Sequence, residues 1–146
     1  KHLVQELFDL LEPKRKLRNT SFEINTIGDS TTVFADLNRI SQVLKNLIDN
    51  AVKYGNDNGS VSVKLEGLEN SVKISVKDDG NGIPVEHLDK IFRRFYRVEK
   101  SRSREMGGTG LGLAIVKHII EAHNSNITVQ STINEGTEFQ FELQKG

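Results

Sequence analysis

The segment from Asp36 to Tyr54 is the longest helix candidate in the chain, and it limits the possible folds strongly. An α-helix turns by about 100° per residue, so apolar residues three and four positions apart share one face. Six residues of the segment follow that spacing: Ile40, Val43, Leu44, Leu47, Ile48 and Ala51. The pattern predicts an amphipathic helix that begins at Asp36 or Asn38, ends at Tyr54 and buries one face against a second layer.

Runs in which apolar and polar residues alternate predict strands, and turn signals between two such runs predict hairpins. Three pairs fit: 22–27 with 31–36, 61–67 with 71–78, and 126–132 with 138–144. Further helices are expected before Pro13 and from Gly110 to His123, and a short helical turn at 88–92. Strand pairs interleaved with three helices predict an α+β two-layer sandwich, with a mixed, mostly antiparallel sheet and three helices on one face.

The composition fits a single domain of 146 residues and excludes several kinds of site. Lys and Arg number 20, as do Asp and Glu, so no net basic charge attracts nucleic acid or an anionic membrane. The lack of cysteine excludes disulfides, thiolate metal sites and a cysteine nucleophile. Because the chain begins without Met inside a helical pattern, we expect a fragment of a longer protein. No apolar run is long enough to span a membrane.

Three polar residues lie beside the apolar stripe of the long helix. Asn46, Asn50 and Lys53 fall within a sector of roughly 60° on the helix, at the edge of the expected core. Amide oxygens can bind Mg²⁺, and an ammonium group can contact phosphates. The alternative is an ordinary solvated helix flank.

Asp78 ends a strand whose alternate residues Val72, Ile74 and Val76 are apolar, so its carboxylate shares their face. Burial of a carboxylate is costly without a hydrogen-bond donor, and the exocyclic amine of adenine is a suitable one. Gly80 and Gly82 would allow a flat base to approach the backbone. A local turn at the strand end is the alternative interpretation.

Residues 107–116, GGTGLGLAIV, place four glycines directly before an apolar helical run. Glycines there suit a phosphate held at a helix N-terminus, or a flexible turn. The preceding segment, 90–106, is rich in Lys and Arg and predicts a lid over phosphates, with Phe92 and Phe95 anchoring its base; a nucleic-acid patch is the rival.

The last helix is expected to bury a stripe that includes a histidine: Leu111, Ala114, Ile115, His118, Ile119 and Ala122. We interpret His118 as a residue at the edge of the core, satisfied by hydrogen bonds. The other histidines have no metal-ligand spacing, and we assign none of them to catalysis.

Taken in order, NLIDNAVKY, DDGNGIP, IFRRFYR and GGTGLGLAIV resemble the N, G1, F and G2 boxes of the sensor histidine kinase catalytic and ATP-binding domain (HATPase_c). This is the Bergerat, or GHKL, ATP-binding fold shared with DNA gyrase and heat-shock chaperone ATPases. The resemblance covers nearly the whole chain. The lid sequence, from Phe95 to His123, is similar to the phosphate-regulon subgroup.

The resemblance implies a role for each matching residue. Asn50 would bind Mg²⁺ with Asn46 nearby, and Asp78 would bind the adenine amine. Lys53 and Tyr54 would contact phosphate and nucleotide. The base pocket would be shaped by Gly80, Gly82 and Ile83. Arg97 would reach the terminal phosphates of ATP, and the lid, about 88–108, would lead into the residues that close over the phosphate chain: Gly108, Thr109, Gly110, Leu111 and Gly112.

The chain departs from the family pattern in two places. Hydrolytic relatives carry a glutamate base where this chain has Asn46, and an amide cannot remove a proton from water at neutral pH. Catalysis is therefore expected to rest on Asn46, Lys53 and Arg97 as positioning and charge-neutralising groups, and to transfer a phosphoryl group to a side chain, with ADP as product. The second glycine pair of the family is replaced by Asn124, Ser125 and Asn126, with little expected effect, because asparagine can adopt the left-handed conformation.

No histidine here has the family's phosphoacceptor context. The resemblance therefore implies an upstream dimerisation and phosphoacceptor domain, and a response regulator as the further partner. The parent would be a homodimer anchored in the cell membrane, with this part cytoplasmic and monomeric when isolated. The rivals are an anti-sigma-factor-type serine kinase and a nucleotide-gated docking module; nucleic-acid binding is not expected.

Overall fold

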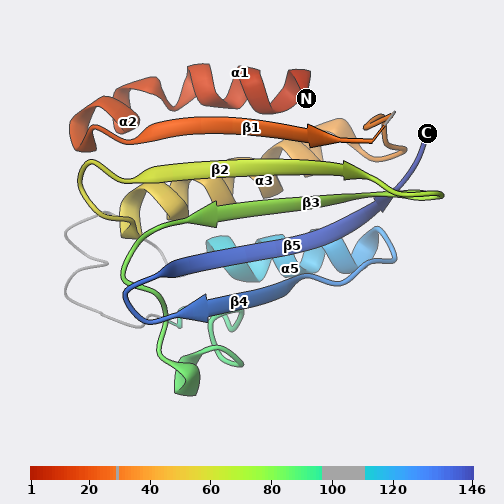
Figure 1. The fold of residues 1–146 in the computed structure, drawn as a ribbon. Helices are drawn as coiled ribbons and strands as arrows, with labels where there is room; N and C mark the ends of the chain where they lie inside the picture. Colours follow the sequence, from red (N-terminus) through yellow and green to blue (C-terminus); the bar gives the residue numbers. More distant parts are fainter. Residues whose placement is uncertain (29, 97–110) are drawn as a thin grey trace.

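The protein is represented by a computed structural model that describes residues 1–28, 30–96 and 111–146 (Figure 1). Helices and strands follow one another in this order: α1 (His2–Leu10), α2 (Glu12–Arg18), β1 (Ser21–Ile27), α3 (Leu37–Tyr54), β2 (Ser60–Gly67), β3 (Ser71–Asp78), a 3-10 helix (Val85–His87), α5 (Gly112–Ala122), β4 (Thr128–Thr132) and β5 (Gly136–Gln144). None of the helices in these three ranges combines the length and the hydropathy needed to cross a lipid bilayer.

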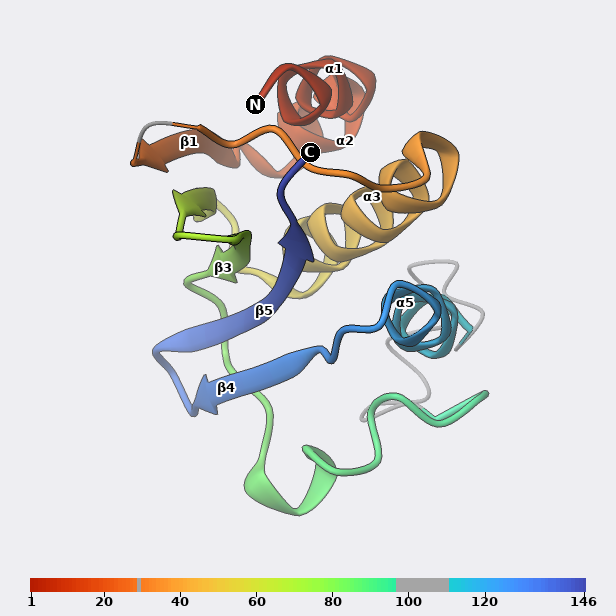
Figure 2. The ribbon, with the colours of Figure 1, turned by 90° about the vertical axis from the view of Figure 1, so that its right-hand side faces the viewer.

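The strands form one sheet in the order β1-β2-β3-β5-β4. Strand β1 is parallel to β2, and every other neighbouring pair is antiparallel. The α1, α3 and α5 helices lie on the same side of the sheet (Figure 2). The predicted α+β sandwich with a mixed, mostly antiparallel sheet is therefore confirmed, although four α-helices, rather than three, occur in the described ranges.

Two of the three predicted hairpins, β2–β3 and β4–β5, are confirmed. The first is wrong: β1 pairs with β2 across the intervening α3, and residues 31–36 contribute only an isolated bridge between Val33 and Lys145. A turn signal favours a local hairpin, but in the parallel pairing of β1 the Phe22 ring stacks on Phe8 of α1, and Phe22 and Ile24 are partly buried.

The long helix α3 forms the centre of the core. All six predicted stripe residues are buried, with Leu47 and Ile48 fully inaccessible. Asp36 caps the helix start by accepting a hydrogen bond from the backbone N–H of Arg39 at 3.1 Å. The helix therefore holds its polar flank, with Asn46 and Asn50, in a fixed direction.

The helix expected before Pro13 is confirmed as α1, which ends at Leu10, but a second helix, α2, begins at Glu12 and was not predicted. Proline is tolerated in the first turn of a helix, where its missing N–H would have no intrahelical partner. The basic run after Pro13 is thus helical and ends at Asn19, which is left-handed, with φ 52°.

The final helix starts at Gly112, and its buried face differs from the predicted one. Val116, Ile119 and Ile120 are buried, whereas His118 is exposed, so its interpretation as a core-edge residue is wrong. The run is apolar nearly all round, and periodicity therefore could not fix its face.

The expected helical turn at 88–92 follows directly on a 3-10 helix at Val85–His87, and the backbone N–H of Ile91 donates to the carbonyl oxygen of His87 at 3.0 Å. Of the two predicted anchors, Phe92 packs edge-on against Phe139, with ring centroids 6.1 Å apart. Phe95 is 69% exposed and is not an anchor.

Candidate functional site

The predicted polar flank of α3 lies beside the start of α5. Asn46, Asn50 and Lys53 are all half-buried. Asn46 Nδ2 donates a hydrogen bond to the carbonyl oxygen of Gly112 at 3.4 Å. This bond leaves the Asn46 amide oxygen available as an acceptor, and it joins two segments that are 66 residues apart in the chain.

Lys53 forms an ion pair with Asp49, four residues earlier in α3, which was not among the predicted site residues. Its Nζ lies 3.1 Å from Asp49 Oδ2, and the other oxygen of Asp49 lies 2.8 Å from Nζ of Lys14 in α2. Two ammonium groups thus share one carboxylate, which leaves a net positive charge next to Asn50.

Asp78 is buried at the end of β3, with 9% of its surface exposed. Its Oδ1 accepts a hydrogen bond from the backbone N–H of Gly80 at 2.9 Å. Burial raises the pKa of the Asp78 carboxyl, backbone N–H groups of Gly80 and Thr137 lower it in part, and the nearby Asp79 carboxylate adds to the rise. The sequence left two interpretations of Asp78 open, a local turn at the strand end and a buried hydrogen-bond acceptor. Asp78 shows both features.

The glycines after Asp78 allow close approach of backbone segments. A Cβ at Gly80 would lie 2.8 Å from the carbonyl oxygen of Tyr54, so β3 and the end of α3 meet here. Gly82 has φ 79°, and a Cβ there would overlap the carbonyl oxygen of Thr132. Ile83 is fixed by its backbone N–H, which donates to Ser131 Oγ at 2.7 Å. These contacts form a wall of backbone next to the Asp78 carboxylate.

The structure thus brings predicted residues of different elements together in two contacts, Asn46 with Gly112 and Tyr54 with Gly80, in addition to the local bond from Gly80 to Asp78. Tyr54 is 38% exposed, and Leu111 is half-buried. Arg97, Gly108, Thr109 and Gly110 lie outside the described residues, as does most of the predicted lid.

Sequence reasoning missed a pair of hydroxyl groups behind Asp78. Thr137 pairs with Asp78 across the sheet and is 6% exposed. Its Oγ1 lies 2.9 Å from Ser131 Oγ. The signal available was Gly136-Thr137 at the start of a strand: Gly136 has φ 125°, and a Cβ there would overlap the Asp78 carbonyl oxygen.

The donors in this region suit Mg²⁺ better than a metal that needs a complete protein cage. No group of three or more His, Asp or Glu side chains suited to a metal occurs within 1–28, 30–96 and 111–146. Amide oxygens of Asn46 and Asn50 remain, and Mg²⁺ commonly takes one or two protein oxygens and completes its shell with water and phosphate.

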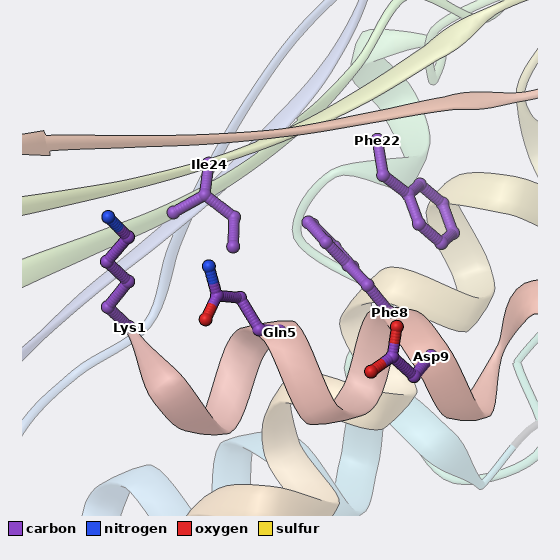
Figure 3. Close-up of a pocket in the computed structure, with 6 residues that line it drawn as sticks. All are labelled: Lys1, Gln5, Phe8, Asp9, Phe22 and Ile24. Carbon is purple, nitrogen blue, oxygen red and sulfur yellow. The ribbon is translucent and has the colours of Figure 1, made fainter.

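A separate cavity of about 570 Å³ lies between α1 and β1 (Figure 3). The stacked rings of Phe8 and Phe22, 4.4 Å apart, line it together with Ile24. None of the predicted site residues contributes to it.

The raised pKa of Asp78 predicts how stability depends on pH. A carboxyl whose pKa is higher in the folded than in the unfolded state stabilises the fold below its unfolded pKa and loses that contribution as pH rises through the folded pKa. We therefore expect the free energy of unfolding of the wild type, minus that of Asp78→Asn, to increase as pH falls from 7 towards 4. Urea unfolding at a series of pH values measures it, and a difference that stays constant or decreases would contradict the assignment.

Comparisons with known proteins identify the family of the chain. The family described as histidine kinase-, DNA gyrase B- and HSP90-like ATPases matches residues 35–146. The sensor protein kinase WalK of Staphylococcus epidermidis is 50% identical over 110 residues, which are 73% of this chain and 18% of WalK. This chain therefore spans less than a fifth of that relative.

Solved structures extend the likeness to the N-terminal helices. The catalytic domain of histidine kinase ThkA, in a nucleotide-free form, is 36% identical, with 99% of this chain and 91% of that chain covered and a TM-score of 0.85. ThkA in complex with the response regulator protein TrrA matches at 33% identity, 99% and 40% coverage and a TM-score of 0.81. Full-length ShkA in complex with AMPPNP matches at 29% identity, 97% and 29% coverage and a TM-score of 0.84.

These names do not test the phosphate-regulon subgroup, which stays a prediction. The family match covers most of the chain, and the likeness to the ThkA catalytic domain covers nearly all of both chains. The chain therefore belongs to the histidine kinase-, DNA gyrase B- and HSP90-like ATPases, as a catalytic domain of the sensor histidine kinase type.

Proposed function

We propose that this domain binds Mg-ATP between α3, the end of β3 and the start of α5, and presents the γ-phosphoryl group to a histidine on a separate helical domain of the parent protein. One observation carries the proposal: the buried Asp78 carboxylate has no Lys, Arg or His ion-pair partner within the described ranges, and it adjoins a wall of backbone that a flat base can approach. The backbone N–H groups of Gly80 and Thr137 leave part of the acceptor capacity of this carboxylate unused, and the adenine amine would supply a further donor.

The phosphate chain would extend from that wall along the flank of α3. Asn50 and Asn46 would hold Mg²⁺ through their amide oxygens, while Lys53, and Arg97 from the lid, would meet the phosphate oxygens. When bound, Mg²⁺ neutralises charge on the phosphates. Gly108, Thr109, Gly110, Leu111 and Gly112 would close over the phosphate chain at the start of α5.

The domain would position ATP rather than hydrolyse it. Asn46 cannot act as a general base, so its amide is a ligand or an orienting group. The acceptor histidine itself is the nucleophile, and the chain's own contribution is alignment and positive charge.

The parent would supply the remaining parts. We propose an upstream dimerisation and phosphoacceptor domain, a response regulator as downstream partner and a homodimeric, membrane-anchored parent with this domain on the cytoplasmic side. The complex of ThkA with TrrA supports a response regulator as partner. The isolated domain is expected to be monomeric.

Supplying the missing acceptor tests the function. The domain, [γ-³²P]ATP, Mg²⁺ and the phosphoacceptor hairpin of the parent are mixed, and we expect acid-labile, base-stable label on the hairpin histidine. Replacing that histidine with alanine should abolish the label.

The other outcomes identify the rivals. Acid-stable label would indicate a serine kinase. Tight ATP binding in calorimetry without label, even in the full-length parent, would indicate a docking module. A gel shift that falls steeply with salt, without ATP binding, would indicate nucleic-acid binding.

A further inference from the structure

The end of α3 next to the site is held by an arginine from another helix. Arg18, the last residue of α2, donates from its guanidinium to the carbonyl oxygens of Val52 (3.0 Å), Lys53 and Gly55 (2.6 Å). Its Nε donates to Asp57 Oδ1 at 3.0 Å. The Arg18 side chain is only 19% exposed, so its bonds to the three carbonyl oxygens are partly shielded from water, whereas Asp57 is exposed.

These bonds replace the usual helix ending. The last four carbonyls of an α-helix have no intrahelical partner, and a left-handed glycine commonly satisfies some of them. Gly55 follows α3 but is extended, with φ −76° and ψ 176°, so it provides no such cap. The five donors of a guanidinium and its positive charge suit the negative end of the helix.

The residues at the capped end of α3 connect the polar flank of α3 with the Asp78 region of the proposed site. Lys53 and Tyr54 belong to the last turn of α3, and Gly55 Cα would lie 2.9 Å from a Cβ on Gly80. Gly80 in turn donates its N–H to Asp78. Displacing the last turn would therefore move both the proposed phosphate contact and the backbone wall beside Asp78.

A second side chain of α2 reaches the same helix. Lys14 pairs with Asp49, which also pairs with Lys53. Helix α2 thus contacts α3 at two points, one helical turn apart in each helix.

We propose that Arg18 is a positioning residue for the nucleotide site: it fixes the last turn of α3 without touching the nucleotide. This inference rests on the proposed function. Arg18 precedes the residues matched by the family, 35–146, so that match assigns it no role. The fixed turn keeps Lys53 and Tyr54 in place before nucleotide arrives, which lowers the ordering cost of binding.

Arg15 provides a matched control in the same helix. Its guanidinium donates to Glu12 and to the carbonyl oxygen of Thr20 at 3.1 Å, and none of these bonds reaches α3. Arg15→Ala therefore removes an arginine and its bonds from α2 but leaves the end of α3 capped.

The experiment compares Mg-ATP affinity by calorimetry for wild type, Arg18→Ala, Arg18→Lys and Arg15→Ala, at a temperature where circular dichroism shows all of them folded. We expect Arg18→Ala to weaken affinity about tenfold and Arg18→Lys about threefold, with Arg15→Ala within about twofold of wild type. In hydrogen exchange of the nucleotide-free protein, the amides of residues 54–56 and Gly80 should lose protection only in the Arg18 variants.

A folded Arg18→Ala with wild-type affinity would overturn the proposal, as would an equal loss in Arg15→Ala. If Arg18→Ala does not fold, Arg18→Lys decides: wild-type affinity together with unchanged protection at Gly80 overturns the proposal. Failure of the proposed function looks different, because the wild type itself would then bind no Mg-ATP.

Discussion

Asp78→Asn is expected to weaken the binding of Mg-ATP and Mg-ADP at least about 100-fold. The reason is the direction in which the new amide must point. The backbone N–H of Gly80 already donates to Oδ1, so the amide oxygen turns to Gly80 and the NH₂ group faces the nucleotide. The NH₂ group of the substituted side chain and the exocyclic amine of adenine would then face each other as two donors, so no hydrogen bond forms between them. Calorimetry with both nucleotides measures the loss.

The neighbouring carboxylate gives the control. Asp79 is exposed, and its oxygens accept hydrogen bonds from the N–H (3.0 Å) and the hydroxyl (3.2 Å) of Ser60. Asp79→Asn should change the affinity by no more than about twofold. Full affinity in Asp78→Asn, or an equal loss in both variants, would show that the adenine assignment is wrong.

Gly136→Ala is expected to lower the free energy of unfolding by about 3 kcal/mol and to weaken nucleotide binding as well. Gly136 has φ 125°, a conformation essentially restricted to glycine, and the added Cβ would overlap the carbonyl oxygen of Asp78. Either β5 or the end of β3 must shift, and Asp78 moves with it. Urea unfolding gives the stability, and calorimetry on the folded protein gives the affinity.

Gly112→Ala is the control for Gly136→Ala, because Gly112 has space for a Cβ and Gly136 does not. Among the described residues outside its own helix and chain neighbours, a Cβ at Gly112 would meet only Asn46 Cγ, at 3.9 Å, and Gly112 is helical. Its stability should be unchanged or raised by up to about 1 kcal/mol. Equal destabilisation of both variants would contradict the claim that only Gly136 lacks space for a Cβ. A Gly136→Ala variant as stable as the wild type would contradict the close approach of Gly136 to the Asp78 carbonyl oxygen.

Local periodicity was sufficient to predict the elements whose contacts are local. The stripe of α3, the hairpins β2–β3 and β4–β5, and the burial of Asp78 after Val72, Ile74 and Val76 all follow from spacing along the chain. The parallel pairing of β1 with β2 does not, because it depends on an α3 crossover rather than on a turn.

The parts of the site that sequence did not predict depend on tertiary contacts. The Arg18 cap and the Lys14–Asp49 pair join α2 to α3, and no spacing within either helix indicates them. The hydroxyl pair of Ser131 and Thr137 lies behind Asp78 only because β5 is its neighbour in the sheet. Family motifs indicated the residues of the proposed site, whereas the contacts that support these residues required the fold.

The most direct test of one nucleotide site is a titration of isotope-labelled protein with Mg-ADP, followed by NMR. The backbone amide of Gly80 reports on the adenine side, and the side-chain amide of Asn50 reports on the phosphate side. We predict that both signals shift with the same dissociation constant and that neither shifts in Asp78→Asn at the same concentrations. Signals that respond with different constants, or an Asn50 amide that does not move at saturation, would contradict a single nucleotide spanning both.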